Sequence, residues 1–267
     1  MTPEPGSAPL HVDRRPDGVV LVTLDVPALR NAMTAELTTA WTSAMEELRG
    51  DRSVRCVVVT GAGPAFCSGG DTSWIGSEPD ASVDQLRERM LPFYRAWLGI
   101  RDLEAPSIAA VNGPAIGAGM ALALACDLRY ATPTAKLGVP FTKLGMHAGM
   151  ATTWLLPEVA GLASARELLL TGRVVSGDDA VAAGVVNRLL PAEGFLDAVL
   201  AIAADVAAAA PIATRLTKVA LRGGGHADYE AALQWEALAQ PITLASADLQ
   251  EGLAAQREKR PPRFSGR

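Results

Sequence analysis

Apolar positions along the first half of the chain follow two alternating patterns. Short apolar runs, most of them rich in β-branched residues, predict strands. These runs are residues 19–24, 54–60, 107–111 and 128–131. Longer stretches between them carry apolar residues at helical spacing, as Leu37, Trp41, Met45 and Leu48 do. Strands that alternate with helices predict an α/β core.

Capping residues indicate where the first helices begin. Thr34 precedes the periodic segment that runs to about Leu48, and a threonine hydroxyl can accept a free backbone N–H at a helix start. Ser82 and Gln85 have the spacing of a capping box, which predicts a helix from there to about Ile100. A third helix, made of small residues, is expected to begin near Gly117.

The second half of the chain has a different pattern. Its helical candidates are residues 161–171, 176–183, 194–209, 212–222, 227–239 and 242–258. Only residues 185–190 have the composition of a strand in this half. An α/β core followed by a C-terminal helical region is therefore the predicted fold class.

The segment 105–126 is the one candidate for a membrane span, because its 22 residues carry no charge. Pro106 and the run from Asn112 to Pro114 interrupt it. Two apolar runs joined by such breakers fit a buried strand, a turn and a buried helix better than a membrane span. The N-terminal residues also lack the basic and apolar pattern of a secretory signal.

Composition narrows the classes of partner. The 267 residues carry a formal net charge of −5, which argues against a general nucleic-acid binder because phosphate binding requires surplus basic charge. Cys56, Cys67 and Cys126 are an odd, scattered set with no paired spacing for a metal or a disulfide framework. Such cysteine usage is typical of a reducing cytoplasm.

Candidate chemistry lies in three segments that leave predicted strands: residues 65–71, 112–119 and 137–150. Glycine and alanine in the first two leave backbone N–H groups uncovered, and the second opens a helix, whose free N–H groups lie at the positive end of its dipole. Two converging N–H donors are the requirement of an oxyanion hole. Taken singly, each loop fits a tight turn better. Neither matches a phosphate-binding pattern.

In their order and spacing the segments resemble the crotonase family, the enoyl-CoA hydratase/isomerase superfamily. The resemblance runs from about Val12 to Phe264. It includes Arg30-Asn31-Ala32, AFCSGGD, PSIAAVNGPAIGAGMALALACDLRYA, LGVPFTKLG, SGDDAVAAGVVN and EKRPPRF. It implies a spiral of ββα units with a CoA-thioester pocket over residues 1–195, and a C-terminal helical oligomerisation region over residues 196–267. It further implies homotrimers or hexamers, no metal, and no cofactor beyond the CoA of the substrate.

The resemblance also implies roles for individual residues. The amides of Gly70 and Ala118 correspond to the two donors of the oxyanion hole, which would stabilise a thioester enolate. Arg30 and Ala32 lie where the family meets the CoA nucleotide. Lys259 matches a lysine that reaches a neighbour's CoA phosphate, although a solvated charge at a helix end is an equal alternative. The implied substrate-binding set is Arg30, Ala32, Ser68, Gly69, Gly70, Asp71, Gly117, Ala118, Ala121, Phe141 and Lys259.

One departure from the family pattern decides what reaction to expect. Hydratases of the family carry two glutamates, at the positions that Ala121 and Phe141 occupy here. Water addition to an enoyl thioester needs one group to activate water and another to protonate the α-carbon. Alanine and phenylalanine can do neither, so ordinary hydratase activity is expected to be weak.

His147 is the residue that we consider as a catalytic substitute, because it follows the segment of the second missing glutamate and a histidine titrates near neutral pH. A histidine bonded to backbone in a turn is the stronger alternative. Other acids and nucleophiles are expected to be structural or solvated. They are Cys67, Asp71, Glu78, Asp80, Asp84 and Asp127.

Three functions therefore stay open from the sequence. The first is an active enzyme of the hydratase or isomerase class with a substituted acid or base. The second is a non-catalytic protein that binds acyl-CoA and has lost the chemistry. The third is a decarboxylase, since loss of CO2 from a malonyl-type thioester yields the same enolate without a base. The otherwise intact pocket favours the first.

Overall fold

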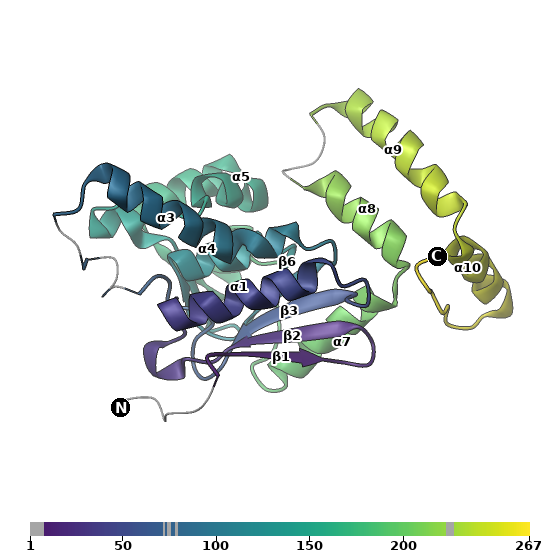
Figure 1. Cartoon of the computed structure of the whole chain (residues 1–267), viewed down its shortest axis with the longest axis horizontal. Helices are drawn as coiled ribbons and strands as arrows, with labels where there is room; N and C mark the ends of the chain where they lie inside the picture. The colour runs from purple at the N-terminus through teal and green to yellow at the C-terminus, as the bar shows by residue number, and fades with distance from the viewer. Residues whose placement is uncertain (1–7, 72, 74–75, 78–79, 223–226) are drawn as a thin grey trace.

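The computed structural model describes residues 8–71, 73, 76–77, 80–222 and 227–267. Its main sheet has six strands in the order β1-β2-β3-β4-β6-β9, and only β1 runs antiparallel to its neighbour (Figure 1). The strands are β1 (Leu10–Arg14), β2 (Val19–Leu24), β3 (Cys56–Gly61), β4 (Ser107–Val111), β6 (Leu128–Ala131) and β9 (Arg188–Leu189). A second sheet of order β5-β7-β8 is formed by β5 (Ala115–Ile116), β7 (Lys136–Gly138) and β8 (Val174–Ser176).

The central strands are buried on both faces, which explains their continuous apolar runs. All six residues of β3 are buried, and their side chains divide between two cores. Val57 and Val59 belong to a core with α1 (Ala35–Arg49) and α4 (Ala118–Ala125). Val58, one position along, packs on the opposite face with α7 (Phe195–Ala208). The period of two in the strand therefore places helices on both sides of the sheet.

The predicted caps are present. Thr34 Oγ1 accepts the Leu37 N–H at the start of α1. Ser82 and Gln85 form a complete capping box at the start of α3 (Val83–Leu98). Trp41 of α1 stacks on Trp97 of α3 with ring centroids 5.0 Å apart, so the two helices share a buried aromatic contact.

The uncharged segment 105–126 is a strand, a turn and a helix, as predicted, because it forms β4, β5 and α4. All eight residues of α4 are buried. Within the described residues, no single helix is long and apolar enough to cross a membrane, and α7 and α8 (Pro211–Leu221) meet that test only as a pair bent by 105°.

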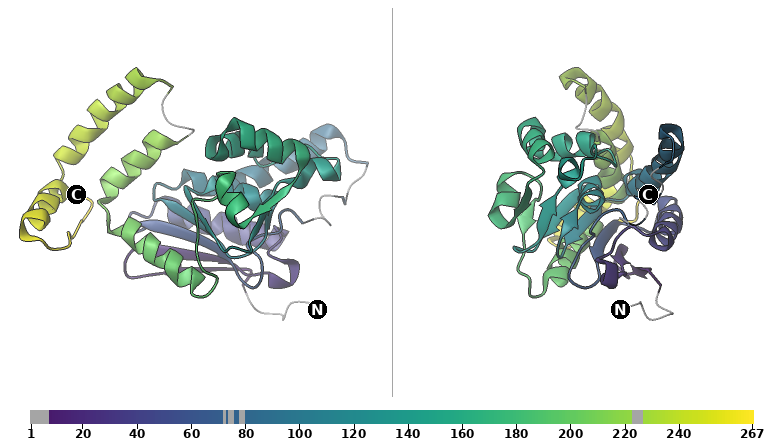
Figure 2. Two further views of the ribbon diagram at one scale, coloured as in Figure 1. Left: turned by 180° about the vertical axis from the view of Figure 1, so that it is seen from behind. Right: turned by 90° about the vertical axis from the view of Figure 1, so that its left-hand side faces the viewer.

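The remaining helices are α5 (Thr152–Thr171), α6 (Gly177–Ala182), α9 (Tyr229–Leu244) and α10 (Ala247–Glu258), with 3-10 turns at Pro27–Leu29, Gly99–Asp102 and Pro140–Leu144. Figures 1 and 2 show α8, α9 and α10 extending away from the sheet, whereas α7 packs against it. By its packing α7 belongs with the sheet; the predicted division of the chain at residue 195 stays a prediction.

Several predicted boundaries were wrong. Two helical segments make up α5, separated by a non-helical backbone at Gly161; the second matches the helix predicted at 161–171, and the first, which begins at Thr152, was not predicted. The break predicted between residues 239 and 242 lies at Ala245, since α9 continues through Pro241. The strand predicted at 185–190 is reduced to the two residues of β9.

Candidate active site

A small cavity of about 90 Å³ lies between α3, the start of α4 and the segment that precedes α5. Its described lining residues are Gly70, Met90, Phe93, Tyr94, Ala118, Phe141, Met146, His147, Gly149 and Met150. The fold thus brings together four residues that sequence analysis selected from three separate segments: Gly70, Ala118, Phe141 and His147. None of the described lining residues is a carboxylate.

Two backbone amides of this cavity have no acceptor among the described residues. Ala118 is the first residue of α4, where a helix has free N–H groups, and Gly70 follows the loop after β3. Neither N–H has a hydrogen-bond acceptor within the described part of the chain. An unpaired pair of amides at one apolar cavity is the arrangement that an oxyanion requires.

The loop after β3 abuts the start of α4 because glycine stands at the contact. Gly69 has a φ of +102°, and a Cβ atom there would lie 2.6 Å from the Ile116 oxygen and 3.3 Å from the Ala118 nitrogen. A Cβ atom at Gly119 would lie 2.0 Å from the Cys67 oxygen. Any larger residue at either position would separate the two loops, so the small residues are needed for the approach of the two amides.

Asn31 holds the first loop from beneath. It is fully buried, and its Nδ2 donates to the Ala62 oxygen at 3.0 Å and to the Ala65 oxygen at 2.8 Å. Its Oδ1 accepts the Val26 N–H at 2.9 Å. The Asn31 side chain therefore bonds the backbone of Val26 and also the backbone of the loop after β3, which carries Gly70.

We expect Asn31→Ala to lower the free energy of unfolding by about 2–3 kcal/mol, because it leaves buried backbone groups without partners. Ser68→Ala is the matched control, since its hydroxyl makes one exposed bond, to the Leu29 oxygen at 3.2 Å. That control should change stability by no more than about 0.5 kcal/mol. Urea unfolding measures both variants, and equal stabilities would contradict the role of Asn31.

Ala121 and Phe141, where the sequence analysis predicts that two glutamates are replaced, differ in their surroundings. Phe141 is half-buried and lines the cavity, and a Cβ atom built at Gly117 would lie 3.8 Å from its ring. Ala121 is fully buried in the core of α4 and is not among the described lining residues. The predicted part of Ala121 in substrate binding stays a prediction.

His147 is exposed at the cavity, with Nδ1 2.7 Å from the Ala148 oxygen. Because a carbonyl only accepts, Nδ1 carries a proton in this contact, and the neutral ring then has its lone pair on Nε2. His147 is therefore both bonded to backbone in a turn and adjacent to the cavity.

Two predicted loop residues make local bonds. Asp71 Oδ1 accepts from the Ser73 N–H at 2.9 Å and from its hydroxyl at 2.7 Å. The Ser68 N–H donates to the Arg30 oxygen at 2.9 Å. Both contacts shape the loop that carries Gly70.

The predicted CoA-nucleotide residues lie outside the cavity. Arg30 and Ala32 stand on the turn beside the first loop, and Lys259 ends α10, which Figure 1 shows far from α3 and α4. Asp80 and Asp84 are exposed and do not line the cavity, and Glu78 lies outside the described residues. Within one chain the structure does not bring these groups together.

The three thiols are buried and free. Burial raises the pKa of Cys67 to about 12, so this thiol keeps its proton at neutral pH. A thiolate nucleophile at Cys67 is therefore excluded under ordinary conditions. No group of three His, Cys, Asp or Glu side chains in the described ranges could hold a metal ion.

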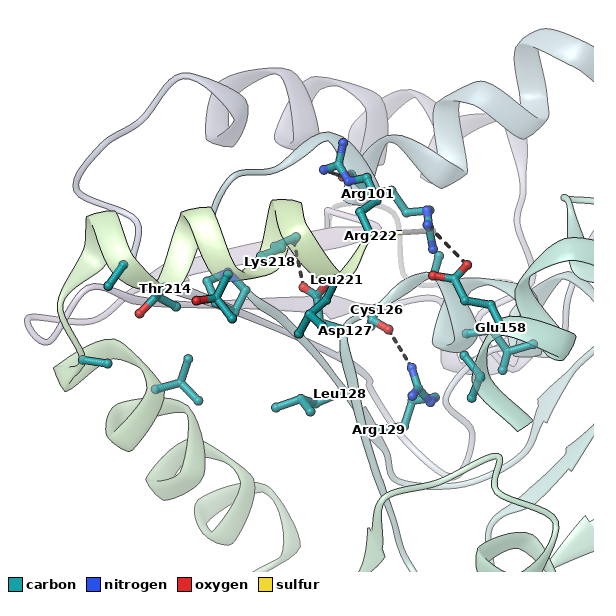
Figure 3. Close-up of a pocket in the computed structure, with 18 of the residues that line it drawn as sticks. Arg101, Cys126, Asp127, Leu128, Arg129, Glu158, Thr214, Lys218, Leu221 and Arg222 are labelled. Atoms are coloured by element: carbon teal, nitrogen blue, oxygen red, sulfur yellow. Dashed lines mark hydrogen bonds and ion pairs between the residues drawn. The ribbon is translucent and has the colours of Figure 1, made fainter. Parts of the chain in front are cut away.

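A second, larger cleft of about 760 Å³ lies at the other end of α4, between the core and α8 (Figure 3). Lys218 of α8 reaches Asp127 across it at 2.8 Å, and Asp127 also accepts the Ser107 N–H and hydroxyl at 2.7 Å. Arg129 donates to the Cys126 oxygen at 2.6 Å. The cleft shares none of its described lining residues with the small cavity. Asp127 thus anchors the turn after α4, as expected.

Comparison with known proteins identifies the family. Residues 14–267 match the family model described as enoyl-CoA hydratase/isomerase. The chain belongs to the enoyl-CoA hydratase/isomerase family. The mitochondrial enoyl-CoA hydratase domain-containing protein 2 of Bos taurus is 35% identical over 254 residues, which are 93% of this chain and 85% of that protein. The mitochondrial methylglutaconyl-CoA hydratase of Rattus norvegicus is 32% identical over 262 residues, covering 96% and 82%.

Solved structures of this family have the same fold. The enoyl-CoA hydratase from Bacillus anthracis superposes with a TM-score of 0.90 at 32% identity, over 97% of this chain and all of that chain. The enoyl-CoA hydratase of Mycobacterium smegmatis gives 0.88 at 31% identity, over 97% and 99%. The predicted crotonase-like α/β fold is confirmed.

Two residues of the site were not found by sequence analysis. In the sequence Asn31 stands out only as part of the motif Arg30-Asn31-Ala32. Nothing near it indicates that its side chain bonds a loop more than 30 residues away. Tyr94 stands in a helix with few buried residues, and only the packing of α3 on the cavity selects it.

Proposed function

We propose that the protein is an enzyme of the hydratase/isomerase class that binds an acyl-CoA thioester and stabilises its enolate through the Gly70 and Ala118 amides. The observation that carries the proposal is the pair of unpaired N–H groups at one apolar cavity. Negative charge that develops on a thioester oxygen is stabilised by such preorganised donors, because they need no reorientation during the reaction.

The rest of the cavity supports chemistry other than ordinary hydration. Phe141 occupies the wall with an apolar ring, and the described lining residues include no carboxylate that could activate water. His147 is the proposed proton carrier, because the free Nε2 of its ring can accept a proton. No metal or further cofactor is part of the proposed reaction.

A decarboxylase is the second candidate, favoured by the same lack of a carboxylate among the described lining residues. Loss of CO2 from a malonyl-type thioester leaves the electron pair on the α-carbon and forms the enolate directly. The two amides would stabilise that enolate, and a proton would then complete the acyl product.

The experiment is a turnover and binding panel with pure crotonyl-CoA, malonyl-CoA and butanoyl-CoA. Conversion of crotonyl-CoA would support an enzyme of the hydratase/isomerase class, and release of CO2 from malonyl-CoA would support a decarboxylase. Calorimetric binding of butanoyl-CoA without turnover of either reactive thioester would show a non-catalytic acyl-CoA-binding protein. No binding of any thioester contradicts the proposal as a whole.

We further propose a homotrimer or hexamer in which Lys259 reaches the CoA of a neighbouring subunit, while Arg30 and Ala32 meet the nucleotide. Exposed apolar side chains on α9 and α10 support this. They are Leu233, Leu238, Ile242, Leu244 and Leu253. Figure 1 shows α10 far from α3 and α4, whose residues line the cavity, and this separation supports a contribution between subunits rather than within one.

Light scattering should give the mass of three or six chains at micromolar concentration. Leu238→Glu/Ile242→Glu should shift that mass towards the monomer, because it places charges on an apolar surface that a second copy would cover. Val83→Glu is the control, since Val83 is a highly exposed apolar residue on α3. A wild-type monomer would contradict the proposed assembly.

We also propose a cytoplasmic location. Three free, buried thiols support a reducing compartment.

A further inference from the structure

We propose that the Tyr94 hydroxyl recognises an oxygen atom on the acyl chain, so that the preferred substrates are CoA thioesters of oxygenated acyl groups. The inference names the substrate class of the proposed function and therefore rests on it. The oxygen in question belongs to the acyl chain and is distinct from the thioester oxygen that the two amides would hold.

The position of Tyr94 is the first argument. The residue projects from α3 and lines the cavity between Phe93 and the segment that precedes α5. Its hydroxyl lies over Gly149, where a Cβ atom would be only 2.6 Å from the oxygen. The absence of a side chain at Gly149 thus leaves the space that the hydroxyl occupies. Gly70 and Ala118 belong to other elements, so the hydroxyl and the amides stand on different walls.

The hydroxyl also has no hydrogen-bond partner among the residues that the structure describes. Tyr94 makes no hydrogen bond with any of the described residues, and its ring packs at a tilt against that of Phe93, with the centroids 6.2 Å apart. The other side chains of the described lining are apolar, except for His147. The Tyr94 hydroxyl is not among the buried unpaired side-chain atoms of the described residues, so water reaches it in the free protein, and a ligand that enters the cavity must either replace that water's hydrogen bond or lose it.

The protonation state of the hydroxyl decides what kind of atom it selects. Burial raises the pKa of Tyr94 above its usual value, so the phenol stays neutral and carries its proton at physiological pH. A neutral phenol donates one hydrogen bond, and an oxo or hydroxyl oxygen on the acyl chain can accept it. An alkanoyl chain has no such acceptor, so it would displace water from the Tyr94 hydroxyl without replacing the hydrogen bond.

The test is calorimetric binding of two matched pairs of thioesters to the full chain: butanoyl-CoA with 3-oxobutanoyl-CoA, and pentanoyl-CoA with 4-oxopentanoyl-CoA. In at least one pair, the oxo thioester should bind about 10-fold more tightly to the wild type. Tyr94→Phe should remove this preference by weakening the oxo thioesters and tightening the alkanoyl thioesters, because it deletes both the donor that the oxo oxygen uses and the hydroxyl that an alkanoyl chain would desolvate.

Gly149→Ala is the second variant, because its Cβ atom displaces the hydroxyl without removing it, and it should also weaken the preference. Tyr130→Phe is the matched control, since Tyr130 lies in β6 outside the cavity; the preference should persist. Equal binding within both pairs by the wild type, or a preference that survives Tyr94→Phe, would overturn the inference while thioester binding stands. A wild type that binds no thioester would overturn the proposed function as well.

Discussion

We expect the wild-type protein to hydrate crotonyl-CoA at no more than about 0.1 s⁻¹, whereas a typical enzyme turns over at about 10 s⁻¹. The physical reason is the lack of a carboxylate at Ala121 and Phe141, the positions where the predicted family pattern places the two hydratase glutamates. The loss of one general acid or base costs about 10²–10⁴-fold in rate. Two losses need not multiply, because groups that act as a unit are strongly non-additive.

The structure shows which replacement is informative. Phe141→Glu places a carboxylate at the cavity wall, where the ring is half-buried, and should raise hydration by about 10-fold or more. Ala121→Glu buries a carboxylate in α4, all of whose residues are buried. The variant that combines Ala121→Glu with Phe141→Glu should therefore have a lower free energy of unfolding than the wild type.

His147→Ala removes the imidazole that the described lining of the cavity contains, and it should lower any residual wild-type rate while acyl-CoA affinity stays the same. The measurement is the absorbance loss of crotonyl-CoA with each variant. A wild-type rate of about 10 s⁻¹ or more would show that the two missing glutamates do not limit this protein.

Ala118→Pro should lower turnover of whichever thioester the wild type converts by about 10²–10³-fold, the effect of removing one donor from an oxyanion hole. Ala118 is the first residue of α4 and follows Gly117. Proline is accepted at this helix position, because the N–H that it lacks has no partner within the helix. The substitution therefore removes the donor without removing a hydrogen bond of the helix.

Ala118→Gly is the matched control, because it retains the N–H while also changing the side chain. It should keep turnover within about 10-fold of the wild type. Affinity for free CoA should be unchanged in both variants, since the nucleotide is held elsewhere in the proposed complex. Full turnover by Ala118→Pro would show that this amide does not hold the thioester oxygen.

Local patterns in the sequence predicted the elements that local forces produce. Strands β2, β3, β4 and β6 follow from their apolar runs, and the caps at Thr34 and Ser82 follow from side chains that bond within three residues. Strand β1 was missed because four of its five residues are exposed. The three-residue strands β7 and β8 were missed because they exist only through pairing with each other and with β5.

The start of α5 shows the same limit. Ala151 precedes it with a left-handed backbone and makes no side-chain cap, so the sequence carries no signal for the first turn. The site itself was predictable where glycine permits a close approach of loops, as at Gly69 and Gly119. The position of Tyr94 at the cavity was not predictable, because it depends on how α3 packs in the tertiary structure.

The contrast between α4 and its surroundings has a consequence for how this family can diversify. Every residue of α4 is buried, so almost any substitution there creates a cavity or a collision and is removed by selection against unfolded chains. By contrast, α3 has Trp97 as its one buried residue, and the turn Pro140–Leu144 has none. Mutations there should cost less stability than mutations in α4, and in the proposed function they would alter the acyl wall while the Gly70 and Ala118 amides stay in place. New acyl specificities can evolve in this scaffold, or be selected from libraries at Met90, Phe93 and Met146, without rebuilding the chemical centre.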